Sequence, residues 1–184
     1  MTKIDEEKLG TPDIRIAGLQ IWIHGYQYAE AENEHDANWL RVSAHCGASG
    51  ASVWVSGSIL STYDIKELAS ASEKMYQNQI KEIEVDPMEP GLHLAIKTTD
   101  SCGHLELTVE ITPDHLFQQH SFQFEIDQSY LPPIEAQCKK ILDRFPVFSG
   151  PVARTSRDRS LCHALRPVPW HLHVLRQIEQ GPCP

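Results

Sequence analysis

The clearest chemical feature of the sequence is a run of carboxylates that follows a pair of tyrosines. Tyr26 and Tyr28 come first, and four acidic residues then fall within seven positions: Glu30, Glu32, Glu34 and Asp36. Like charges this close repel one another, so a folded protein keeps them solvated or sets them against a positive partner. Aromatic residues beside charges are typical of interface hot spots. We therefore expect these six side chains to bind a basic partner, although a simple solvated loop would have the same composition.

Catalytic chemistry has weaker support. The sequence contains no G-x-S-x-G nucleophile motif, no phosphate-binding loop and no G-x-G-x-x-G motif. Paired carboxylates do occur, Glu82 with Glu84 and Glu106 with Glu110, but on strand faces that alternation predicts to be solvent-exposed. We expect no enzymatic activity and no catalytic residues, and a metal-independent hydrolase is the remote alternative.

The histidines and cysteines give no pattern typical of a metal site. His24, His35 and His45 flank the acidic run, but metal sites need imidazoles at compatible spacings, usually with a carboxylate. The cysteines are odd in number and widely spaced, with no C-x-x-C pair: Cys46, Cys102, Cys138, Cys162 and Cys183. This spacing argues against a disulfide framework and a zinc ribbon. We expect no metal, no cofactor and a reducing compartment.

Alternating apolar residues predict the strands that must position the acidic run. A strand pair is expected within residues 13–28, with a turn or bulge at Ala17-Gly18. Further strands are predicted at Trp39–His45, Ala51–Ile59, Ile80–Val85, Leu92–Thr98, Leu105–Ile111 and Ser121–Ile126. Trp39 opens an alternating strand, and we expect it to be a structural anchor in the core.

Two amphipathic helices complete the pattern. Apolar residues at helical spacing predict one helix from its cap at Ser61 to about Gln77, and another from about Leu131 to Arg144 with Ser129 as its cap. Because long crossovers between successive strands are missing, a doubly wound parallel sheet is excluded. We predict an α+β fold, mainly antiparallel β: a β-sandwich or open barrel of about seven to eight strands with two helices packed on it.

Charge is distributed unevenly along the 184 residues. Residues 1–148 carry 11 Lys and Arg against 23 Asp and Glu, whereas residues 149–184 carry 5 Arg, no Lys and 2 acids, with five of the twelve prolines. We predict a disordered N-terminus at 1–12, a single β-rich domain at 13–148 and a non-core, basic, Pro-rich tail at 149–184. A change of reading frame downstream of the domain is one hypothesis for this tail.

The acidic charge also bears on partners and location. An acidic body repels phosphate backbones and steers basic proteins toward it, so we expect a protein partner and no direct contact with nucleic acid. The N-terminus lacks the apolar run of a signal peptide, and no stretch reaches the roughly 20 apolar residues of a membrane helix. We therefore expect a cytoplasmic protein that makes no membrane contact.

Four short motifs resemble the WapI family of bacterial immunity proteins. They follow one another in the family's order over residues 13–148: Gly25-Tyr-Gln-Tyr28, His35-Asp-Ala-Asn-Trp-Leu-Arg-Val42, Glu89-Pro-Gly-Leu92 and Asp143-Arg-Phe-Pro-Val147. Asp-Ala-Asn-Trp-Leu is the most distinctive of these elements, and the long basic tail departs from the family pattern.

The resemblance implies an antidote that binds the C-terminal nuclease domain of a cognate polymorphic toxin and blocks it by occlusion. Inhibition of this kind has no catalytic residues to carry over. A carboxylate-rich surface could mimic phosphate in a basic nuclease cleft, which agrees with the expectation drawn from the acidic run. The alternative function is a β-sandwich binding module for a small ligand or peptide, which would require a deep apolar pocket.

Overall fold

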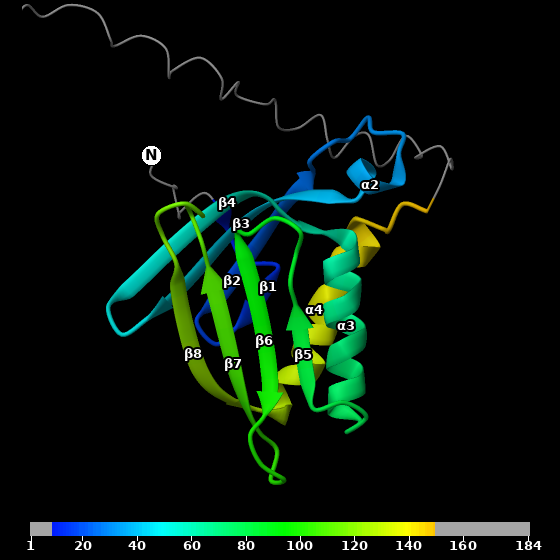
Figure 1. Ribbon diagram of the computed structural model, residues 1–184. Helices are drawn as coiled ribbons and strands as arrows, with labels where there is room; N and C mark the ends of the chain where they lie inside the picture. Colours follow the sequence, from blue (N-terminus) through cyan, green and yellow to red (C-terminus); the bar gives the residue numbers. More distant parts are fainter. Residues whose placement is uncertain (1–8, 150–184) are drawn as a thin grey trace, which may run out of the picture. The chain divides into compact units, whose positions relative to one another are not determined.

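Strands with alternating buried residues build the first sheet. The structure is a computed structural model that describes residues 9–149. The sheet is antiparallel, and its strand order follows the sequence: β1 (Ile14–Ile16), β2 (Leu19–Tyr26), β3 (Trp39–Ala48) and β4 (Ala51–Ser61). Figure 1 shows the long β3–β4 hairpin crossing behind the second sheet.

Two tight turns connect these strands. Ser49 and Gly50 both have positive φ, 45° and 88°, as a two-residue hairpin of type I′ requires. β3 therefore extends to Ala48, further than the loop Cys46–Gly50 expected from its glycines. At the β1–β2 turn, a Cβ on Gly18 would lie 2.3 Å from the backbone oxygen of Gly47, so only glycine allows this approach.

The second sheet is also antiparallel and sequential. It consists of β5 (Glu82–Val85), β6 (Leu92–Thr98), β7 (His104–Ile111) and β8 (His120–Asp127). β5 starts two residues later than predicted because the chain is still completing the preceding helix end. Asn78 has a φ of 58°, and the amides of Asn78 and Gln79 donate to Met75 and Lys74.

The two predicted helices are present. α3 (Thr62–Tyr76) begins with the expected capping box: the amide of Ser61 donates to Asp64 Oδ2 at 2.6 Å, and Ser61 Oγ accepts from the amide of Asp64. α4 spans Leu131–Arg144 as predicted. Ser129 is not its cap, because a 3-10 turn (η1, Gln128–Tyr130) lies before the helix and is capped by Asp127.

The sheets and helices enclose one hydrophobic core. Its largest fully buried side chains come from both sheets and both helices: Ile14, Ile16, Leu19, Leu40, Ile65, Met75, Ile83, Ile96, Leu105, Leu107, Ile111 and Leu131. α3 and α4 pack on each other and on the edge strands β5 and β1 respectively. The predicted α+β architecture, with antiparallel sheets and two packed helices, is therefore confirmed, and the barrel alternative gives way to two separate sheets.

The described elements run from Ile14 to Arg144. Residues 1–8 and 150–184 lie outside the described part of the chain, and they include most of the predicted N-terminal segment and almost all of the predicted tail. The division into a terminus, a domain and a tail stays a prediction.

Candidate partner-binding site

The acidic run is a defined structure and not an extended loop. Its second half forms a single helical turn, α2 (Glu34–Ala37). Asn33 caps this turn: its Oδ1 accepts from the amide of Asp36 at 2.8 Å, and its Nδ2 donates to Asp36 Oδ2 at 2.8 Å. Capping fixes the direction in which the side chains of Glu34 and Asp36 leave the backbone, so these two charges project from a local framework.

A tyrosine that the sequence analysis did not single out supports this turn from the side. Tyr63, in the first turn of α3, donates from its hydroxyl to Glu34 Oε1. This hydrogen bond to the carboxylate raises the pKa of Tyr63. The ring remains 41% exposed, so Tyr63 is a second exposed aromatic beside these carboxylates, with Tyr28. Its position off the apolar stripe of α3 was the available signal, but only the fold brings it to Glu34.

Five of the six predicted contact residues lie in solvent: Tyr28, Glu30, Glu32, Glu34 and Asp36. The ring of Tyr28 is 48% exposed. Within residues 9–149, the ion pairs involve other carboxylates, so no Lys or Arg of the described chain neutralises these four acids. We refer to Tyr28, Glu30, Glu32, Glu34, Asp36 and Tyr63 as the acidic surface.

Tyr26 is the exception among the predicted contact residues. It is only 8% exposed, its ring packs edge-on against Phe145 at 5.5 Å between centroids, and its hydroxyl donates to the carbonyl of Pro146 at 2.7 Å. The prediction that Tyr26 lies at the binding surface is corrected: it holds the end of β2 to the segment after α4.

The anchor that Trp39 was expected to provide comes from its neighbour, Asn38. Trp39 is only half-buried, because the strand places Leu40 and Val42 on the core side and Trp39 on the other. Asn38 is fully buried. Its side chain donates to the carbonyls of Glu34 (2.7 Å) and Phe148 (2.9 Å). It also accepts from the Thr62 hydroxyl (2.6 Å) and the Phe148 amide (2.8 Å).

These bonds join four parts of the chain at one buried amide. Asn38 links the turn α2, the start of β3, the start of α3 and the segment that follows α4. Because α3 also carries Tyr63, a single side chain sets the position of both elements that build the acidic surface. Within Asp-Ala-Asn-Trp-Leu, Trp39 was predicted to be the anchor, and Asn38 was not singled out.

A ladder of polar side chains crosses the first sheet at His24. His24 bonds to Ser43 Oγ at 2.9 Å, and Ser43 bonds to Ser56 at 2.9 Å, which forms a polar ladder across β2, β3 and β4. Burial, followed by the charge of Arg41, lowers the pKa of His24.

Within residues 9–149, no three metal-ligating side chains gather into a site. Cys46 and Cys138 are buried thiols whose pKa is raised by burial to about 11 and about 12.

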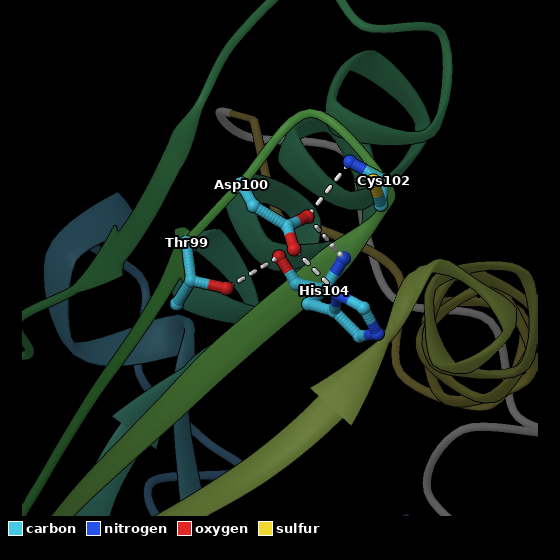
Figure 2. A network of polar contacts seen from close by, with 4 residues as sticks. All are labelled: Thr99, Asp100, Cys102 and His104. Atoms are coloured by element: carbon cyan, nitrogen blue, oxygen red, sulfur yellow. Dashed lines mark hydrogen bonds and ion pairs between the residues drawn. The ribbon is translucent and has the colours of Figure 1, made fainter.

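The close histidine–carboxylate pair at the β6–β7 turn belongs to the turn itself. Figure 2 shows Asp100 accepting from the amides of Cys102 (2.7 Å) and His104 (3.2 Å), while its other oxygen lies 2.5 Å from His104 Nδ1. The side chains of Asp100 and His104 are 42% and 68% exposed. A pair so open to water lacks the enclosure of a catalytic dyad.

This turn gives a testable pH dependence. The hydrogen bond between His104 and Asp100 raises the pKa of His104 and lowers the pKa of Asp100. The contribution of His104 to stability is present below its unfolded pKa of about 6.5 and is lost as pH rises through its raised value. The contribution of Asp100 to stability is lost as pH falls through the lowered pKa of its carboxyl group. In an NMR titration, Asp100→Asn should bring the His104 pKa down toward its ordinary value.

The control for this titration is Thr99→Ala, which removes the 3.1 Å bond from Thr99 to the His104 carbonyl and keeps the carboxylate. It should leave the His104 pKa raised. An unchanged pKa in Asp100→Asn would mean that Asp100 does not hold the imidazolium.

Neither of two cavities within residues 9–149 suits a small apolar ligand. The apolar cavity between α3 and strands β1, β2, β4, β5 and β6 has a volume of about 20 Å³, far below the roughly 300–1,000 Å³ of ligand pockets. A second hollow, of about 290 Å³, is open and lined mostly by polar residues.

In the described part of the chain, no helix is both long and apolar enough to cross a membrane.

Comparison with known families agrees with this geometry. The family model described as "Immunity protein WapI-like family" matches residues 11–146, and the chain belongs to this family. No curated protein and no solved structure gives a significant match. Membership implies toxin neutralisation, a toxin as partner and a role without catalysis. The matched region contains the whole acidic surface, Asn38 and both helices.

Proposed function

We propose that this WapI-like immunity protein neutralises the C-terminal nuclease domain of a cognate polymorphic toxin by covering its basic cleft. It acts in the cytoplasm, without a cofactor and without direct contact with nucleic acid. The observation that carries the proposal is the acidic surface: four exposed carboxylates that no described Lys or Arg neutralises, with Asp36 held by Asn33 and Glu34 by Tyr63.

The physical reason lies in what a nuclease must bind. A cleft that holds a phosphate backbone is lined with Lys and Arg, so it attracts any surface that presents carboxylates at comparable spacing. Attraction between surfaces of opposite charge accelerates encounter and sets orientation more than it adds affinity. A stable complex also needs about 1,600 Å² of buried area and desolvated aromatic anchors. Tyr28 and Tyr63 are the two aromatic rings that the acidic surface offers.

The test identifies the gene upstream of this one and uses the C-terminal domain of the toxin that it is expected to encode. We expect the two proteins to co-elute as a stable complex and the immunity protein to suppress the nuclease activity of that domain at equimolar ratio. Absence of both a complex and inhibition would overturn the proposal. Inhibition without a stable complex would contradict occlusion as its mechanism.

A further inference from the structure

Three of the most exposed apolar side chains in the described structure lie on two loops of the second sheet. Met88 is 71% exposed, Leu116 70% and Phe117 84%. Met88 lies between β5 and β6, and Leu116 and Phe117 lie between β7 and β8. Because β6 pairs with β7 antiparallel, with Leu92 opposite Ile111, both loops leave the same end of the sheet. We call these three side chains the apolar rim.

The two loops face each other across the open hollow of about 290 Å³. The amide of Thr112 donates to the carbonyl of Gly91 at 3.0 Å and ties them together. Both loops and the strand ends between them line the hollow, including Asp86, Pro90, His93, Glu110, His115 and Gln118. Along the chain, Met88 lies between Asp86 and Pro90, and Leu116 and Phe117 lie between His115 and Gln118, so the two loops that line the hollow also carry the apolar rim.

A hydrogen-bonded turn fixes Leu116 and Phe117 in solvent. The carboxylate of Asp114 accepts from the amide of Leu116 at 3.1 Å, and its carbonyl accepts from the amides of Phe117 (3.2 Å) and Gln118 (2.8 Å). A flexible loop could fold such side chains back onto the protein surface, whereas this hydrogen-bonded turn keeps them in solvent. Exposed apolar groups clustered beside polar ones mark interaction sites, and pre-ordered anchors lose less entropy on binding.

The loop that carries Met88 lies beside the helix that carries Tyr63 of the acidic surface. Pro87, next to Met88, and Asp64, next to Tyr63, line the same small cavity, so the β5–β6 loop lies beside the first turn of α3. Tyr63 in turn holds Glu34. Figure 1 shows α2 and both loops at the same end of the described elements.

The charges around the hollow identify the kind of partner. Asp86 and Glu110 line it, and Glu84 lies beside it, bonded to His93 at 3.2 Å. A basic side chain would meet these carboxylates. A second copy of this chain, whose formal net charge is −9, would bring like charges together.

We propose that the apolar rim anchors the toxin domain and that the hollow behind it receives a Lys or Arg side chain of the toxin. This inference rests on the proposed function and extends its interface. The acidic surface sets the rate of encounter, and the apolar rim sets the lifetime of the complex. Interfaces of this type combine a desolvated apolar centre with charged surroundings.

The test is Phe117→Ala in the full chain, measured by surface plasmon resonance against the C-terminal domain of the cognate toxin. Dissociation should accelerate about 10-fold to 100-fold, with little change in association rate or salt dependence. Folding should be unaffected because Phe117 is 84% exposed, and an unchanged circular dichroism spectrum and Tm are the expected controls. The matched control is Tyr76→Ala, an aromatic 53% exposed at the C-terminal end of α3, roughly 20 Å along the helix from Tyr63. It should leave both rates unchanged.

The outcomes separate this inference from the function beneath it. If the wild type binds and Phe117→Ala dissociates at the wild-type rate, the apolar rim is not the anchor and the proposed function stands. If the wild type forms no complex, both proposals fail. If sedimentation instead shows a dimer that Phe117→Ala dissociates while toxin binding is unchanged, the rim serves self-association and the inference is overturned.

Discussion

Replacing Asn38 with Ala is expected to lower the free energy of unfolding by about 3–5 kcal/mol, which is exceptional for a single substitution. The side chain makes four hydrogen bonds from a fully buried position. Without it, the Thr62 hydroxyl, the Phe148 amide and the carbonyls of Glu34 and Phe148 lose their partner together. Each buried group left unsatisfied costs about 1–3 kcal/mol, reduced where water can enter. Urea denaturation measures the change.

Two further variants distinguish the network from loss of side-chain volume. Asn38→Asp keeps the shape and can accept from Thr62 and Phe148, but it loses both donors and places a charge beside two carbonyl oxygens. It should therefore also be strongly destabilising. Asn33→Ala removes only the exposed cap of α2 and should cost about 1 kcal/mol. Equal stabilities for Asn38→Ala and Asn33→Ala would contradict the central role of Asn38.

Reversing the charge of Glu32, Glu34 and Asp36 to Lys is expected to slow association with the toxin domain about 10-fold to 100-fold at low salt. The salt dependence of the association rate should weaken as well, because the steering charges are gone. Stopped-flow measurements at several ionic strengths test both effects. Unchanged rates would place the encounter surface elsewhere on the molecule.

Glu34 and Asp36 also hold the local framework through Tyr63 and Asn33, so a second variant must change charge alone. Glu30→Lys with Glu32→Lys does so, since both carboxylates are exposed and make no such bond. Its matched control is Glu67→Lys with Glu73→Lys on the exposed face of α3, which changes net charge equally. Equal slowing by both pairs would show an effect of overall charge and not of the acidic surface.

Local periodicity was enough to locate most elements of the fold. Strand β6 and helix α4 have the predicted bounds, and Ser61 and Asp64 form the predicted cap of α3. These features depend on residues within a few positions of one another. Burial of alternate side chains and the geometry of a first helical turn are therefore encoded locally.

The candidate site shows where local patterns stop being sufficient. Strict alternation along β2 places Tyr26 on the same side as Gln20 and His24. The pairing of β2 with β3 shifts between Ile23 and Gly25, and this irregularity turns Tyr26 into the core. A bulge is decided by the partner strand, so nothing in residues 19–26 alone could have placed this ring.

Spacing along the chain was sufficient to predict the antiparallel strands, the two amphipathic helices and the acidic run. The position of Asn38 at a buried junction and the contact of Tyr63 with Glu34, 29 residues away, depend instead on how the elements pack. The same holds for the loops that carry Met88 and Phe117, which share one end of a sheet. A buried polar group or a shared surface depends on partners brought together from distant parts of the chain, and packing alone assembles them.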